Sequence, residues 1–426
     1  MVFKCQIDSF LQEFESKVIL CEPASLKKKS SSGKDECVNG FNVVLEDTIL
    51  FPEGGGQPCD FGFMNDKPII DVQRKGIEAH HFVCDSETQS PPFNVGDIVK
   101  CKIDWKRRHD HMQQHSGQHL LSAILEREYN VATKSWWLGT ELSFIEIDPK
   151  INLTAAQIAN IENICNELIA TSTPVSVHTL TDKNEADIPA EITRATKGLP
   201  KDHVGDIRII EIEGIDANMC CGTHVSNLAQ LQCIKLLNLE KNKNRQFLNF
   251  LVGKRVLKRL QECIDREYEF NTILKGGPQW HIELVKKIQI NQKQNQKALS
   301  LCLKELAVHE AARLKLINPQ PKWYSLHRKD GIDTDFISTF LKNVPEIKNA
   351  SNGLSLLFLT SAEESGERGN MILYGDENVV ADLGDKLCEV LNGKGRGKGQ
   401  RFQAKVNNLF KISACEKLID EYFNHK

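Results

Sequence analysis

A chain of 426 residues is too long for one ordinary hydrophobic core, so we expect two to four domains. Its formal net charge of −3 excludes a uniformly basic nucleic-acid binder, and any contact with nucleic acid must come from local patches. No apolar run approaches a membrane span, and the first residues lack a secretory pattern, so we expect a cytoplasmic protein without membrane contact. In the reducing cytoplasm, the 14 dispersed cysteines indicate free thiols and a metal ligand, not a disulfide framework.

Residues 1–105 are predicted to be β-rich, because short apolar runs alternate with turn residues, and we expect a small N-terminal β-barrel or sandwich. The stretch Phe51-Pro52-Glu53-Gly54-Gly55-Gly56-Gln57-Pro58 lies between two of the predicted strands. Its glycines permit positive φ and let a ligand approach the main chain, and exposed amides can hold an anion or a carbonyl. By itself, the run is also explained by a plain tight loop.

Residues 106–130 change to helical spacing and place His111, His115 and His119 on one face. Two histidines one helical turn apart can bind one metal ion, because their rings meet on the same side of the helix. The spacing alone allows either His111 with His115 or His115 with His119. We favour the second pair, since it runs directly into the apolar Leu120-Leu121.

The following residues alternate between strands and a helix, which predicts an α+β domain with an antiparallel sheet over residues 106–258. The predicted strands are 141–147, 175–180, 207–212 and 233–239, and the helix is 155–170. Residues 259–318 are charged and mostly helical, with one long helix over 279–316. We interpret them as a helical spacer rather than an independent coiled coil.

A second candidate metal-binding stretch is Cys220-Cys221-Gly222-Thr223-His224. Together the two stretches offer four zinc ligands, and we expect one Zn²⁺ per chain, bound by His115, His119, Cys220 and His224. We favour Cys220 because its spacing to His224 leaves room for a bend at Gly222-Thr223, and Cys221 stays as the alternative. On ligand count alone, a closed structural zinc is favoured over a catalytic one, which usually keeps an open position.

From residue 319 to residue 426 the pattern predicts a C-terminal α/β domain, with buried strands over 353–359 and 371–375 and a helix over 378–391. Basic residues then alternate with glycines from Gly393 to Gly399. Lys394, Arg396 and Lys398 are candidates for contact with nucleic-acid phosphates, and a flexible solvated turn explains the pattern equally well. The stretch is not a P-loop, because no Lys-Ser/Thr pair closes a spaced glycine frame.

The glycine run, the His-x-x-x-His-Leu-Leu run and the Cys-x-Gly-Thr-His element occur in the order seen in the editing domain of alanyl-tRNA synthetases. The chain resembles still more closely the free-standing AlaX-type alanyl-tRNA editing proteins. In that family a threonine that matches Thr48 precedes the glycine run, and the third motif is usually Cys-Gly-Gly-Thr-His-Val. This chain differs at Cys221, which replaces the first glycine and should alter the loop. The resemblance covers roughly residues 10–258, and the tail resembles the DHH-associated domain of alanyl-tRNA synthetases and longer AlaX proteins.

The resemblance implies a zinc-dependent esterase that deacylates mischarged tRNA in trans, with seryl-tRNA(Ala) as the main substrate and glycyl-tRNA(Ala) as a second one. A synthetase pocket that admits alanine cannot exclude glycine by size, and it discriminates poorly against the extra hydroxyl of serine. We assign serine recognition to Thr48, whose hydroxyl can donate to or accept from the serine Oγ. Backbone amides of the glycine run would hold the ester carbonyl or the terminal ribose, and the expected substrate-binding set is Thr48, Gly54, Gly55, Gly56 and Gln57.

Water is the expected nucleophile, with zinc either binding the substrate α-amino group or polarising a water by expanding its shell. Four protein ligands favour positioning over a permanent zinc hydroxide. The sequence shows neither a serine nucleophile elbow nor a Cys/His/Asn triad, which disfavours covalent catalysis. It also lacks the ATP-binding motifs of a synthetase core, so we expect editing without tRNA charging.

Two other hypotheses fit parts of the pattern. Threonyl-tRNA synthetases carry a related zinc-containing editing fold, so seryl-tRNA(Thr) is an alternative substrate, although the glycine run favours the alanine system. The second alternative is a non-catalytic tRNA-binding adaptor that zinc stabilises, with the long helix and the tail as its interaction surface. The sequence does not predict an oligomeric state.

Overall fold

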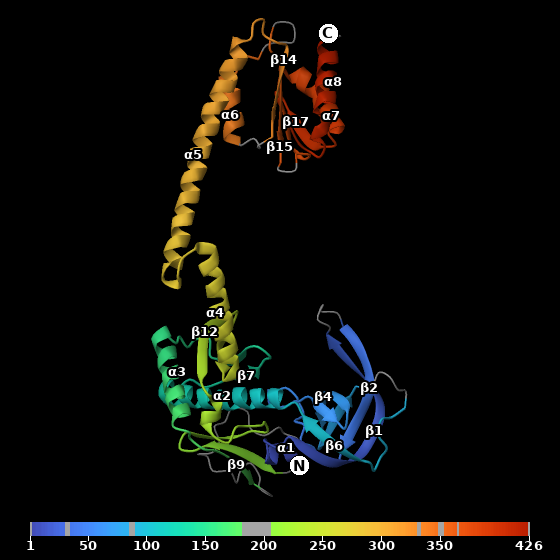
Figure 1. Cartoon of the computed structure of the whole chain (residues 1–426), viewed down its shortest axis with the longest axis vertical. Helices are drawn as coiled ribbons and strands as arrows, with labels where there is room; N and C mark the ends of the chain where they lie inside the picture. The colour runs from blue at the N-terminus through green and yellow to red at the C-terminus, as the bar shows by residue number, and fades with distance from the viewer. Residues whose placement is uncertain are drawn as a thin grey trace. The chain divides into compact units, whose positions relative to one another are not determined.

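The computed structural model describes residues 2–29, 35–84, 90–180, 206–329, 334–347, 353–363 and 366–424. The chain divides into two compact units, Met1–Tyr268 and Glu269–Lys426, and both contain helices and sheets (Figure 1). The predicted α+β class is therefore confirmed. Within the described residues, no helix combines the length and the apolar character that crossing a membrane requires.

Six strands near the N-terminus pair in a closed ring, in the order β1-β2-β5-β4-β3-β6. Alternating burial explains why β6 joins this ring, because Val99, Cys101 and Ile103 face the core while the residues between them are exposed. The glycine run lies between β2 and β3, as predicted. The elements are α1 (Lys4–Ile7), β1 (Glu13–Lys29), β2 (Asp35–Leu45), β3 (Gly62–Met64), β4 (Lys67–Lys75), β5 (Glu78–Val83) and β6 (Ile98–Ile103).

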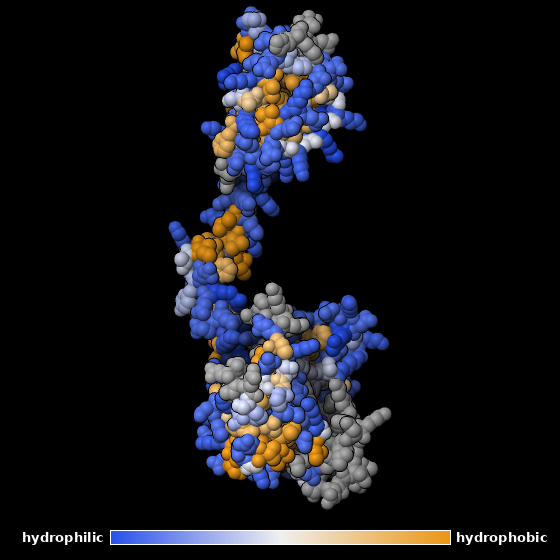
Figure 2. Space-filling model, turned by 90° about the vertical axis from the view of Figure 1, so that its right-hand side faces the viewer, coloured by the Kyte–Doolittle hydropathy of each residue, from blue (hydrophilic) through white to orange (hydrophobic). Residues whose placement is uncertain are grey.

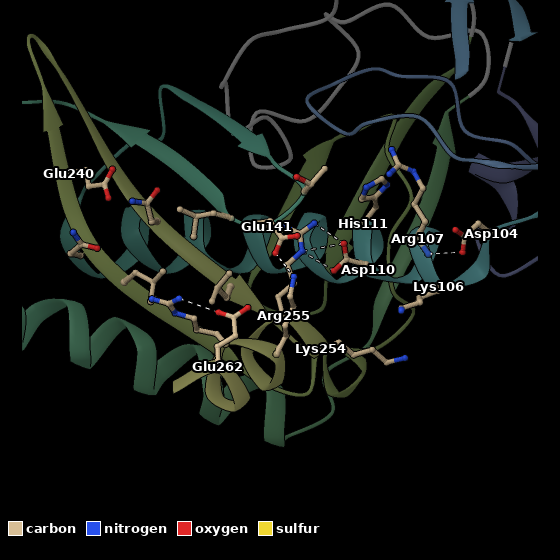
Figure 3. Close-up of a pocket in the computed structure, with 18 residues that line it drawn as sticks. Asp104, Lys106, Arg107, Asp110, His111, Glu141, Glu240, Lys254, Arg255 and Glu262 are labelled. Atoms are coloured by element: carbon tan, nitrogen blue, oxygen red, sulfur yellow. Dashed lines mark hydrogen bonds and ion pairs between the residues drawn. The ribbon is translucent and has the colours of Figure 1, made fainter. Parts of the chain in front are cut away.

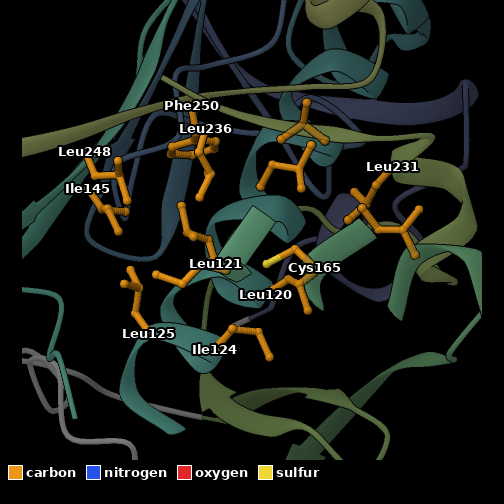
Figure 4. Close-up of a cluster of buried hydrophobic side chains, with 14 of the residues drawn as sticks. Leu120, Leu121, Ile124, Leu125, Ile145, Cys165, Leu231, Leu236, Leu248 and Phe250 are labelled. Carbon is orange, nitrogen blue, oxygen red and sulfur yellow. The ribbon is translucent and has the colours of Figure 1, made fainter. Parts of the chain in front are cut away.

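The helix α2 (Trp105–Tyr129) is central to the first unit and is buried along most of its length. It begins after Asp104, whose side chain accepts a hydrogen bond from the backbone N–H of Arg107, and it ends at Asn130 in the left-handed conformation. Leu120, Leu121, Ile124 and Leu125 of this helix pack in one apolar cluster with side chains of the neighbouring sheet and of α3 (Figure 4). This packing fixes the helix that carries the two predicted histidine ligands.

Two antiparallel sheets accompany α2, in agreement with the predicted antiparallel α+β arrangement. Their strand orders are β12-β13-β8-β7 and β11-β10-β9. The predicted helix over 155–170 is confirmed as α3, which a capping box between Thr154 and Gln157 starts. The elements are β7 (Ser135–Leu138), β8 (Ser143–Ile147), α3 (Ala155–Ala170), β9 (Val175–Leu180), β10 (Ile207–Ile212), β11 (Asp216–Met219), η2 (Leu228–Leu231), β12 (Ile234–Asn242), β13 (Arg245–Val252) and α4 (Lys254–Leu274).

The second unit contains the predicted long helix as α5 (His281–Leu316), preceded by η3 (Pro278–Trp280). Exposed apolar side chains gather at its N-terminal end, where Ile273, Trp280 and Ile282 are each more than half exposed (Figure 2). Its C-terminal end is packed instead, because Ala307, Ala311 and Leu314 are fully buried. Only this last part of α5 belongs to a hydrophobic core.

A five-stranded sheet in the order β14-β15-β16-β18-β17 forms the centre of the second unit. Helices cover both faces, since Leu357 and Leu359 of β15 pack with α5 and α6, whereas Leu356 and Phe358 pack with α7 and α8. The elements are β14 (Trp323–Arg328), α6 (Thr334–Asn343), β15 (Leu356–Ala362), β16 (Gly369–Gly375), α7 (Glu377–Val390), β17 (Lys394–Lys398), β18 (Arg401–Val406), η4 (Leu409–Lys411) and α8 (Ile412–Asn424). The turn considered for the basic glycine stretch is wrong, because these residues form the edge strand β17.

Candidate metal centre

Four side chains from the two predicted stretches converge in the first unit, and their ligand atoms all lie within 4.8 Å of one another. Two come from successive turns of α2, and two come from the loop that follows β11; they are His115, His119, Cys220 and His224. The Sγ atom of Cys220 lies 3.4 Å from Nε2 of His115 and 3.3 Å from Nε2 of His224. The zinc–sulfur and zinc–nitrogen bond lengths of a tetrahedral site place such atoms about 3.5 Å apart. The spacing therefore fits a tetrahedral ion.

Hydrogen bonds orient two of the histidine rings toward this centre. Nδ1 of His115 donates to Oε1 of Gln57 at 2.8 Å, because that oxygen also accepts the backbone N–H of Thr223. Nδ1 of His224 lies 3.0 Å from Oγ of Ser116. Because Nδ1 of His115 donates, its Nε2 presents a lone pair to the cluster, and the contact with Ser116 allows the same tautomer of His224, which is the one that metal-binding histidines use.

A buried arginine on β10 holds the loop that carries Cys220. Arg208 donates through Nη1 to the carbonyl oxygens of Cys220 and Gly222, at 2.8 and 2.7 Å. Its Nε donates to the carbonyl of Gln6, and the amide of Gln6 donates in turn to the carbonyl of Cys221. These contacts hold the backbone from Cys220 to Gly222, at the sulfur ligand and directly after it.

The donor chemistry also suits zinc. Burial holds the pKa of His115 and His224 well below the usual histidine range, so both rings stay neutral and keep a lone pair. Burial raises the pKa of the Cys220 thiol to about 12, and Arg208 opposes this change. A coordinated cation reverses the balance and favours the thiolate. Three imidazoles and one thiolate are ligands that zinc prefers.

The structure separates both pairs of alternatives that the sequence left open. Cys220 lies in the cluster, whereas Cys221 is exposed and outside it. His119 lies in the cluster, whereas His111 does not, although it is one turn before His115. Burial lowers the pKa of His111 to about 3, so its ring is neutral as well.

Comparison with known proteins identifies the family. The chain is 43% identical to the alanyl-tRNA editing protein Aarsd1 of Mus musculus, over 99% of this chain and 98% of the relative. The chain belongs to the alanyl-tRNA editing protein family. It is also 29% identical to the putative alanyl-tRNA editing protein alaX of Saccharomyces cerevisiae, over 99% of this chain and 96% of the relative. The resemblance predicted from the three motifs is confirmed.

Two further matches cover parts of this editing-family chain. The alanyl-tRNA editing protein AlaX-M of Methanosarcina barkeri is 28% identical over 57% of this chain and 96% of the relative. The family described as "Threonyl and Alanyl tRNA synthetase second additional domain" matches residues 207–249. This range contains β10, β11, the loop with Cys220 and His224, and β12. The family match therefore includes half of the metal cluster.

The glycine run of the editing-family chain forms a tight turn. Gly54 and Gln57 exchange backbone hydrogen bonds, and Gly55 and Gly56 between them have φ of 54° and 78°. A Cβ atom on Gly56 would lie 2.5 Å from the ring of Trp136, whose centroid is 4.7 Å from that of His115. Position 56 thus requires glycine for two reasons: its φ is positive, and the ring of Trp136 beside the metal centre leaves no room for a Cβ atom.

Gln57, predicted from the sequence as a substrate-binding residue, is fully buried. Besides its bond to His115, it donates through Nε2 to Oγ1 of Thr223 at 2.8 Å. The side chain thus links the glycine turn to both ligand-bearing stretches. This geometry gives Gln57 the position of a residue that orients a metal ligand.

Replacing Gln57 with leucine is expected to lower zinc affinity about 10- to 100-fold, the usual cost of losing a partner that orients a metal ligand. Leucine has a similar volume but cannot hold Nδ1 of His115 or the N–H of Thr223. Competition with a zinc-chelating dye would measure the affinity. Gln73→Leu, a change on β4 at a side chain that hydrogen-bonds Asp71, is the matched control and should keep full affinity. Equal affinities of the two variants would contradict the orienting role.

Thr48 is buried, and its hydroxyl has two partners. It accepts from the backbone N–H of Leu50 at 3.0 Å and lies 2.8 Å from Nε2 of His81. Since Nδ1 of His81 donates to the carbonyl of Val43, Nε2 is the acceptor and Thr48 donates to it. Burial lowers the pKa of His81 to about 4, which keeps this arrangement at neutral pH. Thr48 therefore has one lone pair left and can only accept from a further ligand.

Proposed function

We propose that the chain is a zinc-dependent aminoacyl-tRNA deacylase that hydrolyses seryl-tRNA(Ala) in trans, with glycyl-tRNA(Ala) as a second substrate. The observation that carries the proposal is the cluster of His115, His119, Cys220 and His224 beside the glycine turn. The relatives named as alanyl-tRNA editing proteins, which match the chain over nearly its whole length, support the same function.

In this mechanism the four clustered side chains would hold Zn²⁺, which supplies a Lewis acid for positioning and polarising the aminoacyl ester. Gln57 and Ser116 keep the lone pairs of His115 and His224 directed at the ion. Within the described residues, the N–H groups of Gly55 and Gly56 take no part in a backbone hydrogen bond. They are available to the ester carbonyl or the terminal ribose, as oriented donors whose hydrogen bonds strengthen as negative charge develops.

Deacylation assays on the zinc-loaded chain test the proposal directly. Alanine tRNA charged with serine, glycine or alanine, and threonine tRNA charged with serine, would be incubated with equal amounts of protein. We expect fast release of serine from the alanine tRNA and little release of alanine. Faster release from the threonine tRNA would assign the chain to the other editing system. No release from any of the four would overturn the deacylase and favour the adaptor.

Thr48 is proposed to recognise the serine substrate by accepting a hydrogen bond from the serine hydroxyl. Thr48→Val should lower kcat/KM for seryl-tRNA(Ala) about five- to tenfold, the value of one hydrogen bond, and leave glycyl-tRNA(Ala) unaffected. Thr48→Ser keeps the hydroxyl and serves as the control. A Thr48→Val variant that melts at the same temperature and keeps the full preference for serine would remove Thr48 from this role.

The tail is proposed to contact the tRNA backbone through one face of the hairpin β17–β18. Lys394, Arg396 and Lys398 are exposed on β17, and the register places Lys405 opposite Lys394 and Arg401 opposite Lys398. Within the described residues, none of these five cations forms an ion pair with a carboxylate. A row of unpaired cations on an edge hairpin provides the charge that phosphate contacts need.

Replacing Lys394, Arg396 and Lys398 together with glutamine should weaken tRNA binding and lower the slope of log K against log salt by about 2.7, or 0.9 per lost phosphate contact. Filter binding across a salt series would measure the slope. The same triple change at Lys386, Lys411 and Lys417, which are exposed elsewhere on this unit, alters the net charge equally and should leave the slope nearly unchanged. Equal slopes for both triple variants would refute a specific contact at β17.

A further inference from the structure

A groove of about 890 Å³ lies beside α2 in the first unit, and none of the four clustered ligands lines it (Figure 3). Its walls come from the first half of α2, the β7–β8 turn, the hairpin β12–β13 and the start of α4. This volume is within the range of pockets that hold small organic molecules. None of the side chains that line the groove belongs to the metal centre, so the metal centre does not explain their arrangement.

Two buried side chains of the groove carry polar atoms that lack a partner. His111 is 2% exposed and Asn249 is 4% exposed. Within the described residues, Nδ1 of His111 and Nδ2 of Asn249 form no hydrogen bond. Buried polar groups are nearly always satisfied, and a donor left unpaired costs stability. Two such atoms, one from α2 and one from β13, therefore indicate that a ligand with hydrogen-bonding edges completes them.

The remaining lining combines apolar surface with charged side chains of both signs, including the acidic Asp104 and Glu240. Leu142 and Leu251 contribute apolar side chains. Ion pairs occupy three other cations, in the pairs Arg255–Asp110, Lys258–Glu141 and Arg259–Glu262. Lys106 and Lys254 are exposed, and in the described part of the chain neither is paired with a carboxylate. The combination is that of a nucleotide site, in which apolar groups contact the base, buried polar atoms bind its edge and cations bind phosphate.

The groove and the metal centre share one face of α2. His111 precedes His115 by one helical turn, which is about 6 Å along the axis. A nucleotide bound over His111 would therefore have its chain neighbour next to the metal centre.

We propose that this groove binds an unpaired nucleotide of the RNA substrate, with the base edge on Asn249 and His111 and the adjoining phosphates on Lys106 and Lys254. The identity of that RNA as mischarged tRNA rests on the proposed function. The groove would then hold the single strand next to the aminoacylated terminus and direct the ester to the cluster.

The test measures fluorescence anisotropy of a labelled single-stranded RNA tetranucleotide on the zinc-loaded full chain, with no ester present. Asn249→Leu should weaken binding five- to tenfold, because it removes one hydrogen-bond donor at nearly constant volume. The fold should survive, since the change removes an unpaired buried amide. Lys106→Gln combined with Lys254→Gln should lower the salt slope by about 1.4, or 0.7 per phosphate of a single strand. Lys150→Gln, at an exposed lysine outside the groove, should leave binding and slope unchanged.

A folded Asn249→Leu variant that binds the tetranucleotide as tightly as the unchanged chain would overturn the proposal. So would a nucleoside monophosphate that binds as tightly as the tetranucleotide, because the ligand would then be a free nucleotide. If no charged tRNA is hydrolysed and Asn249→Leu still loses RNA binding, the groove proposal stands and the deacylase proposal fails.

Discussion

Replacement of His119 with alanine is expected to lower the rate of serine release from seryl-tRNA(Ala) about a hundredfold or more, and to lower the zinc content of the purified chain well below one ion. His119 is one of four ligands, and its ring centroid lies 4.7 Å from that of His224. Removing it leaves three protein donors and opens the centre to water. A polarising ion contributes several kcal/mol to the transition state, so we expect a loss on the order of a hundredfold or more.

The matched control for this variant is His178→Ala. His178 is an exposed histidine on β9 that pairs with Glu211 at 2.7 Å and lies outside the cluster. Zinc content from elemental analysis and deacylation rates would be measured for both variants at equal protein concentration. Serine release that persists in zinc-free His119→Ala would refute the role of the metal. Loss of activity in His178→Ala would show that histidine loss alone, without loss of a ligand, disturbs the fold.

Local pattern predicts the elements on which the site stands. The helix over residues 155–170 carries a capping box and a periodic apolar side, so its bounds follow from neighbouring residues alone. The same holds for α2, where the spacing of His115 and His119 places both rings on one face. Both ligand-bearing stretches could therefore be located from the sequence, with His111 and Cys221 still open as alternatives to His119 and Cys220.

Contacts between distant segments could not be predicted in this way. Gln57 reads as part of a substrate loop, yet its amide binds His115, 58 positions along the chain. Arg208 supports the Cys220 loop from β10, and nothing in its local sequence marks it. The groove likewise joins residues from four separate parts of the chain. The sequence does not show that buried polar atoms of His111 and Asn249 lack hydrogen-bond partners, because this depends on the tertiary structure.

The edge strand β17 is an element that local propensity predicts wrongly. Alternating glycine and basic residues predict a mobile turn by propensity, since glycine weakens strands. The structure keeps the strand because Gly395 and Gly397 lie against Ala404 and Phe402 of β18, where a Cβ would be only 2.5 and 2.7 Å away. Close packing against one neighbouring strand thus overrides local propensity.

Gly222→Ala is expected to disrupt the metal centre as severely as the loss of a ligand. A Cβ atom at this position would lie 2.1 Å from Cε1 of His115 and 2.8 Å from Oε1 of Gln57. The ring cannot yield, because Gln57 holds its Nδ1 and the ligand cluster holds its Nε2. Either the loop or the ring must move, and each movement separates Cys220 from His115. We therefore expect loss of most bound zinc and at least a hundredfold lower deacylation rate.

The neighbouring change Cys221→Ala supplies the control, because the side chain of Cys221 is exposed and outside the cluster. It alters the same loop by a substitution of similar size, but it adds no atom near His115. Zinc content and deacylation should stay close to those of the unchanged chain. Since Cys220 is the sulfur ligand in this geometry, Cys220→Ala should behave like Gly222→Ala. If Cys221→Ala lost zinc and Cys220→Ala kept it, the sulfur ligand would be Cys221, and the loop would have to adopt another conformation around the ion.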